Sequence, residues 1–300
     1  QIRVDFKVIE DKYDHFSHYV SNMIDDLSRM CPSRYVNLRD YFKKFDFYIR
    51  FMLAPPEYDF SPPFTLPLEE IPSDAHGKVG GKALNLAAIQ RDLRLPVPKG
   101  FVITTNAFYY FIEFNNLRKS IDARLTGLDI HSSESLTAVS HALMQMIMNA
   151  QIPPDIEEAI FDAFRALQRS EGKDTRIAMR SSAMAEDSLS SFAGLYRTVL
   201  NVTEDGIMEA YKRVLASKYD TRAIYYRVNY GLSDVETPMA VIALKMIDAG
   251  TSGVMYTQDL DNPASNVAAI HAMNSENKTI PHCSMVPPSL PTALAPSIHL

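Results

Sequence analysis

Two glycines and a lysine stand together at the start of a segment with helical periodicity. Gly80, Gly81 and Lys82 precede residues 83–89, a run rich in alanine and leucine. Glycine lets the backbone approach an anion closely, a helix N-terminus presents unpaired amides, and lysine adds a mobile positive charge, so the trio suits a phosphate group. The spacing is not that of a P-loop, because Ala83 replaces its serine or threonine. A plain turn before a helix is the alternative interpretation.

A second set of polar residues comes at the end of a short apolar run. Arg180 is expected to close a strand, and Ser181 and Ser182 then open a loop that continues through a Ser-Phe-Ala-Gly turn from Ser191 to Gly194. An arginine can bind two phosphate oxygens at once, whereas lysine acts as a point charge. The spacing therefore indicates an anion-binding loop. The alternative is an ordinary surface loop in which Arg180 pairs with a nearby carboxylate.

The elements that would position these residues alternate between strand and helix signals. The strand signals lie at residues 100–103, 176–179, 198–202, 239–247 and 252–257. Amphipathic helices are predicted for 106–114, after Ser133, from Pro154 and over 204–227. The short connection containing Gly250 predicts a hairpin between the last two strands. The mixture indicates a fold of the α/β (α+β) class.

Proline content and periodicity divide the chain into four parts. Residues 1–54 read as an aromatic-rich helical module, in which Phe42, Phe45, Ile49 and Met52 form a stripe typical of a packing face. Residues 55–74 contain six prolines and are predicted to be a linker or extended strap. Residues 75–263 form the mixed domain, and 264–300 an irregular tail whose last 22 residues carry no charged side chain.

Composition excludes several classes of protein. Thirty basic and thirty-six acidic residues give a net charge of −6, which argues against a nucleic-acid partner. No apolar run approaches the roughly 20 residues of a transmembrane helix, so no membrane partner is expected. Two distant cysteines and the lack of a signal sequence favour a cytoplasmic protein.

Several short blocks, in this order, resemble the nucleotide-binding region of phosphoenolpyruvate synthase and pyruvate phosphate dikinase. They are residues 79–82, 97–101, 180–183, 186–187, 191–194, 200–202 and 252–257. The resemblance runs from about residue 75 to 260 and implies part of an ATP-grasp-type domain, preceded by the small helical module. It also implies ATP and Mg²⁺ as cofactors and transfer of a phosphoryl group from ATP to a histidine.

The resemblance assigns roles to matching positions. Lys82, after Gly80 and Gly81, and Arg180, before Ser181 and Ser182, match residues that contact the ATP phosphates. The turn from Ser191 to Gly194 matches the loop that covers those phosphates. Lys245, Met246 and Ile247 fall where the family's adenine-side strand runs.

The family's phosphohistidine and pyruvate-binding domains have no counterpart among these residues. We therefore assign no catalytic residue and no metal ligand, and we expect the chain alone to be inactive. The resemblance implies the ATP-binding part of a phosphoenolpyruvate synthase-like (pyruvate, water dikinase-like) phosphotransferase, which meets pyruvate or another acceptor through other domains and forms a homodimer at full length. A related dikinase, an antibiotic phosphotransferase or a non-catalytic nucleotide-binding module remain open as alternatives.

Overall fold

The computed structural model describes residues 6–31, 34–35, 37–53, 59–183, 195–230, 232–256 and 269–274. Contacts divide the chain into two compact units, Gln1–Met246 and Ile247–Leu300.

An antiparallel pair of helices opens the chain, α1 (Phe6–Met30) and α2 (Leu38–Leu53). Asp46 lies between them, because it accepts hydrogen bonds from Tyr13 Oη at 3.0 Å and Ser17 Oγ at 2.7 Å. The predicted amphipathic helix is present. The prediction that its aromatic stripe packs as core is wrong for Phe45, whose side chain is 61% exposed.

A five-stranded antiparallel sheet forms the centre of the first unit, in the order β1-β2-β5-β3-β4. Its strands are β1 (Thr65–Pro67), β2 (Gly100–Ile103), β3 (Ile177–Ala183), β4 (Thr198–Val202) and β5 (Met239–Lys245). The middle strand β5 is an apolar run with buried side chains on both faces, so it needs strand partners on both edges and helices on both sides. The prediction that it forms a hairpin with the next strand is therefore wrong.

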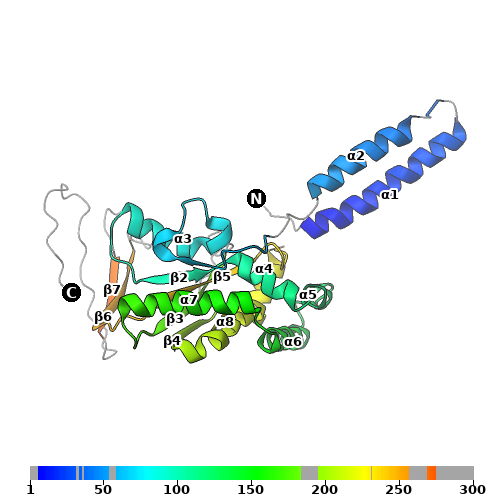
Figure 1. Ribbon diagram of the computed structural model, residues 1–300. Coiled ribbons are helices and arrows are strands. Elements are labelled where there is room, and N and C mark those ends of the chain that lie inside the picture. Colours follow the sequence, from blue (N-terminus) through cyan, green and yellow to red (C-terminus); the bar gives the residue numbers. More distant parts are fainter. Residues whose placement is uncertain are drawn as a thin grey trace. The chain divides into compact units, whose positions relative to one another are not determined.

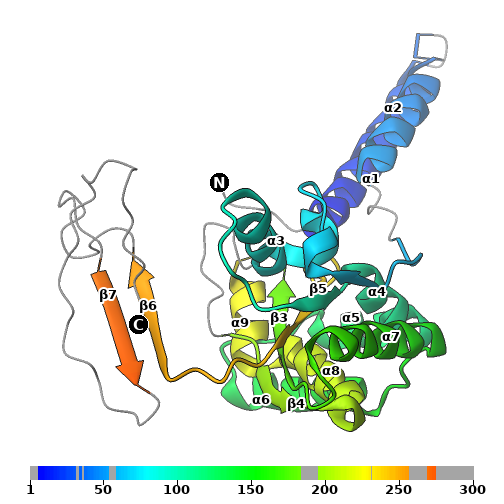
Figure 2. The same cartoon turned by 60° about the vertical axis from the view of Figure 1, so that its left-hand side comes forward.

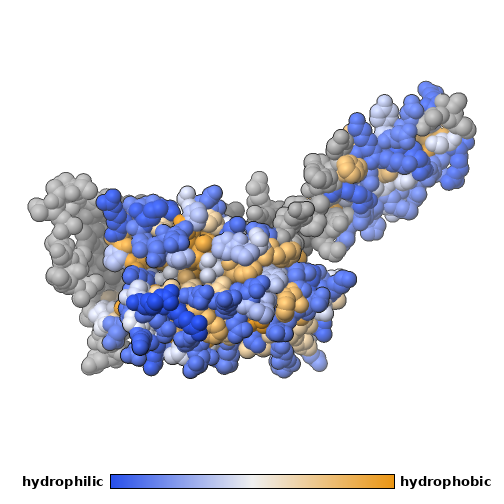
Figure 3. Space-filling model, viewed as in Figure 1, coloured by the Kyte–Doolittle hydropathy of each residue, from blue (hydrophilic) through white to orange (hydrophobic). Residues whose placement is uncertain are grey.

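Helices cover both faces of this sheet (Figure 1). One face packs on α3 (His76–Asp92), through Val79, Ala83 and Ala87. The other face packs on the larger helical layer, which comprises α4 (Thr105–Phe114), α5 (Arg118–Leu125), α6 (Ser133–Asn149), α7 (Pro154–Glu171) and α8 (Ile207–Ala216), followed by α9 (Thr221–Asn229). Figure 3 shows mainly hydrophilic residues over α7, as expected for an amphipathic helix whose apolar side is buried. Short 3₁₀ turns at Leu68–Glu70, Glu204–Gly206 and Ser217–Tyr219 complete the connections.

The described part of the predicted proline-rich linker belongs to the folded unit. Strand β1 pairs with β2 at the edge of the sheet, where Pro67 is tolerated because an edge strand has one unpaired side. Leu68 is fully buried and Ile71 nearly so. Residues 59–74 therefore contribute to the core and are not a linker.

The second unit contains β6 (Thr251–Tyr256) and β7 (Ala269–Asn274), which form a two-stranded antiparallel sheet (Figure 2). Strand β7 lies inside the stretch 264–300 that we expected to be irregular, so residues 269–274 correct that prediction. Among the described helices, none is both long and apolar enough to cross a membrane.

Candidate nucleotide site

Gly80 interrupts α3 and creates a helix start beside β3. Its φ of 71° and ψ of 168° are non-helical, so the regular helix begins again at Gly81 and Lys82. A Cβ atom on Gly80 would lie 1.9 Å from the carbonyl oxygen of Ser182. Glycine is therefore required here twice, for its left-handed conformation and for the close approach to the strand.

Two hydrogen bonds join this helix start to β3 across 99 residues of sequence. The amide of Ala83 donates to Ser182 Oγ at 3.1 Å, so the serine satisfies an amide of the first helical turn. The ammonium of Lys82 donates to the carbonyl oxygen of Ser181 at 3.3 Å. Gly80, Lys82, Ser181 and Ser182 are therefore one structural cluster.

Arg180 lies next to this cluster and inside β3, which does not end at Arg180 as predicted but continues through Ser181 and Ser182 to Ala183. It pairs with Ile242 of β5 and Thr198 of β4 in the ladder. Alternation along the strand places Arg180 and Ser182 on the face covered by α3, while Met179 is buried on the other face. Arg180 is exposed, so this face carries two cations, Lys82 and Arg180, close to one helix start.

The other assigned positions divide between described and undescribed residues. Ser191 and Gly194 lie outside the described residues. Lys245 and Met246 extend the central strand, and their amides donate to the carbonyl oxygens of Lys99 and Arg176, both at 2.8 Å. Ile247 is the first residue of the second unit and is 56% exposed.

Glu171 fixes the side chain of Lys245. Its carboxylate binds Lys245 Nζ at 2.6 Å and Lys99 Nζ at 2.9 Å. Hydrogen bonds from these two lysines hold the pKa of Glu171 below its usual value. In the ladder Lys245 lies three residues beyond Ile242, the partner of Arg180, which is about 10 Å along the sheet.

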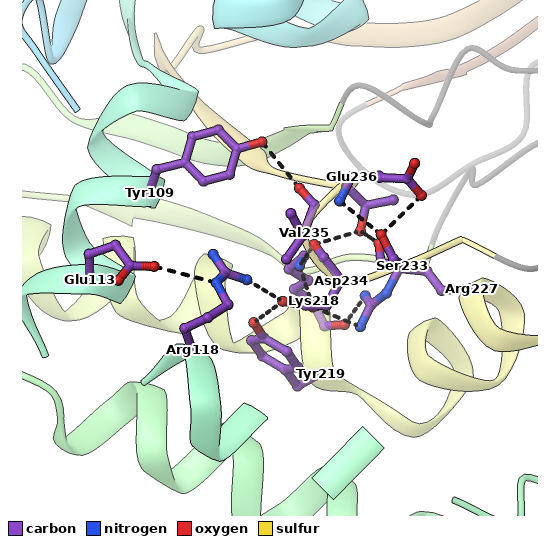
Figure 4. Close-up of polar contacts among 11 residues, drawn as sticks. Tyr109, Glu113, Arg118, Lys218, Tyr219, Arg227, Ser233, Asp234, Val235 and Glu236 are labelled. Atoms are coloured by element: carbon purple, nitrogen blue, oxygen red, sulfur yellow. Dashed lines mark hydrogen bonds and ion pairs between the residues drawn. The ribbon is translucent and has the colours of Figure 1, made fainter. Parts of the chain in front are cut away.

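A buried charged network that the sequence reasoning missed surrounds Asp234 (Figure 4). Lys218 and Tyr219 both donate to its carboxylate, and Lys218 also donates to its main-chain oxygen at 2.8 Å. Arg227 lies 3.6 Å and Arg118 3.4 Å from the same carboxylate. These contacts hold the segment that leads into β5, where Met239 pairs with Ala183 of β3.

Burial dominates the protonation of this network. It lowers the pKa of Lys218 to about 7, opposed by the charge of Asp234. Burial also opposes ionisation of Asp234, but Lys218 and Arg227 hold the pKa of that carboxyl below its usual value. The network is thus a structural ion-pair cluster with one titratable lysine.

The resemblance implies Mg²⁺ as a cofactor. Among the residues that the structure describes, no group of three histidine, cysteine, aspartate or glutamate side chains could hold a metal ion. Mg²⁺ that binds together with a nucleotide is held by the phosphates and by one or two carboxylates, which requires no such group.

Comparison with known proteins identifies the domain. A family model described as pyruvate phosphate dikinase, AMP/ATP-binding domain, matches residues 76–276. The chain is 36% identical over 222 residues to phosphoenolpyruvate synthase of Aquifex aeolicus, which covers 71% of this chain and 26% of the relative. It is 41% identical over 181 residues to a probable phosphoenolpyruvate synthase of Archaeoglobus fulgidus, covering 60% of this chain and 24% of that protein.

The chain is also similar to a protein whose name indicates a different acceptor. The chain is 32% identical over 209 residues to rifampicin phosphotransferase of Bacillus subtilis, covering 69% of this chain and 24% of that protein. The chain thus spans about a quarter of the length of these curated relatives. The match over 76–276 includes β2 to β5, α3 and the Gly80–Ser182 contact, and the chain belongs to the pyruvate phosphate dikinase AMP/ATP-binding domain family.

Proposed function

We propose that this chain is the ATP-binding part of a phosphoenolpyruvate synthase-like phosphotransferase, and that Lys82 and Arg180 bind the phosphates of ATP. The observation that carries the proposal is the contact of Lys82 with the carbonyl of Ser181, the residue next to Arg180. The family match and the similarity to phosphoenolpyruvate synthases support the nucleotide and the reaction class.

Charge neutralisation is the chemistry that these residues can supply. Phosphoryl transfer requires little covalent work from the protein, and catalysis depends on positioning and on stabilising the charge of the phosphates. Arg180 offers a planar pair of donors from a rigid strand, and Lys82 a point charge at a helix start. Gly81 belongs to that same helix start, and Ser191 and Gly194 are proposed to cover the phosphates.

The adenine is proposed to lie beside Lys245, Met246 and Ile247. Lys245 lies about 10 Å from Arg180 along the ladder, a separation that supports an extended nucleotide with its phosphates at Arg180 and its base at the other end of the strand pair. Phosphoryl transfer to a histidine, and then to pyruvate or another acceptor, is proposed to use parts of the enzyme beyond these residues. The proposal includes Mg²⁺ bound with ATP and a cytoplasmic location.

The test is a titration with a fluorescent ATP analogue. Arg180→Ala should weaken binding by about 1.5–3 kcal/mol, and Arg180→Lys should recover only part of that loss, because lysine cannot make the paired contact. Lys82→Ala should weaken binding in the same direction. Arg169→Ala is the matched control, because Arg169 is an exposed arginine of α7, on the opposite side of the sheet from α3. Equal affinities for Arg180→Ala and the control would refute the site.

A rifampicin phosphotransferase-like acceptor is the second candidate. It is favoured by the similarity to the Bacillus subtilis enzyme. Both candidates share the ATP site, so the titration tests what they have in common. A full-length enzyme that phosphorylates rifampicin and leaves pyruvate unchanged would decide for the second candidate.

A further inference from the structure

Helix α1 carries two separate apolar rows. One row faces α2 and includes the buried Ser17 and Ile24. The other contains Phe16, Tyr19, Met23 and Met30, whose side chains are 61–76% exposed. Spacings of three, four and seven residues place this second row on one side of the helix, about a third of a turn from the first.

Helix α2 carries a matching exposed row. Tyr41 and Phe45 are 60% and 61% exposed and stand four residues apart, about a quarter turn from the side that faces α1. The ion pairs Arg50–Asp14 and Arg39–Asp25 fix the antiparallel alignment, which brings Phe45 level with Tyr19. In each helix the exposed row is rotated from the side that faces the other helix in the same direction about the helix axis. Because the two helices are antiparallel, this rotation puts both rows on one face of the helix pair.

The contact between α1 and α2 is thin. Of its described side chains only Ser17 and Ile24 are buried. Two isolated helices with so little core are marginal in water, and more apolar burial is needed to hold them. Six large side chains of 150–250 Å² each, about 60–75% exposed, present on the order of 700 Å². Twice that area falls in the usual range of specific protein interfaces, 1,200–2,000 Å² in total.

We propose that this exposed face (Phe16, Tyr19, Met23, Met30, Tyr41 and Phe45) binds the same face of a second copy of the chain, giving a four-helix bundle. The two-fold axis passes at the level of Tyr19 and Phe45, with the two α1 helices antiparallel. Charge complementarity supports this partner. Lys12 and Asp26 are exposed and each stands seven residues from Tyr19, so Lys12 of one copy faces Asp26 of the other. The family match begins only at residue 76, so the six residues of this face precede the matched domain in the sequence.

The test is sedimentation velocity of the full chain over a wide concentration range, with circular dichroism to verify folding. We expect a reversible dimer, and Tyr19→Glu with Phe45→Glu should raise its dissociation constant by about a hundredfold, because each residue acts from both copies. Phe47→Glu is the matched control, since Phe47 is an equally exposed aromatic residue of α2 that lies outside the face. A chain that stays monomeric at all concentrations, or a dimer that Phe47→Glu weakens equally, would overturn the proposal.

A charge exchange tests the arrangement of the two copies. Lys12→Glu and Asp26→Lys should each weaken the dimer by about two- to fivefold, the usual effect of an exposed ion pair. The double variant should restore it, because the exchanged charges again face each other. Two single variants whose effects simply add would overturn the antiparallel arrangement.

Discussion

Replacement of Gly80 by alanine should separate the α3 helix start from β3. A residue with a side chain costs about 1–3 kcal/mol at a φ of 71° and a ψ of 168°, a conformation essentially restricted to glycine. The added Cβ would also lie 1.9 Å from the carbonyl oxygen and 2.8 Å from the hydroxyl of Ser182. Because that carbonyl belongs to a strand of the central sheet, the helix must move, at a further cost of about 1–3 kcal/mol. We therefore expect a loss of roughly 2–6 kcal/mol in the free energy of unfolding.

The same movement should weaken nucleotide binding. It would lengthen the Ala83–Ser182 and Lys82–Ser181 hydrogen bonds and so displace the lysine that is proposed to meet the phosphates. Urea unfolding and the nucleotide titration measure the two effects. Gly77→Ala is the matched control, because it lies in the same helix with nothing within 4 Å of its added Cβ. Equal stability and equal affinity for the two variants would refute the role assigned to the Gly80 contact.

Two further predictions concern buried polar groups. Ser182→Ala removes the acceptor of the Ala83 amide in a buried contact, so the free energy of unfolding should fall by about 1–3 kcal/mol. Urea unfolding measures this loss. An unchanged midpoint of the urea transition would show that the serine does not stabilise the helix start. Lys218 has a pKa of about 7 in the folded chain, against an ordinary value of 10.5. Between these two pH values the unfolded chain binds more protons, so the free energy of unfolding should rise with pH by up to about 1.4 kcal/mol per pH unit. Lys218→Met should remove that rise, and an unaltered pH dependence of unfolding in this variant would contradict the assignment.

Local patterns predicted much of the fold. The strands at 100–103 and 198–202 have the bounds that the apolar runs indicated. The predicted apolar face of the segment 204–227 is buried at Ile207, Tyr211 and Val214. Periodicity succeeds here because each element buries one face against a single layer.

Strand pairing was harder to predict, because it depends on contacts between distant parts of the chain. The nearest strand signal after β5 is β6, yet β5 pairs with β2 and β3. The apolar run of β5 is buried on both faces, which is typical of a central strand. The hairpin prediction depended instead on the short connection between this run and the next strand signal. For the same reason Arg180 was placed at the end of a strand, although β3 continues to Ala183 beside β5.

Within the candidate site, the glycines and Lys82 could be recognised from a short stretch of sequence, whereas the groups that accept hydrogen bonds from this helix start could not. Gly80 and Lys82 belong to a short motif, but only the fold shows that Ser181 accepts a hydrogen bond from Lys82 and that Ser182 accepts one from the amide of Ala83. The sequence predicted a shared phosphate site from two separate motifs. The structure brings these motifs to one face of the sheet, and their binding of phosphate remains a proposal.

The missed network around Asp234 did leave a signal in the sequence. The apolar stripe of Tyr211 and Val214 continues at helical spacing to Lys218, so the pattern itself places a lysine on a buried face. Arg227 follows the buried Ala223 and Ile224 in the same way. Cations at buried positions require a carboxylate nearby, because an unpaired charge in the interior is costly. The stripe thus predicts that an acid must exist, and only the fold identifies it as Asp234, at the entry to β5.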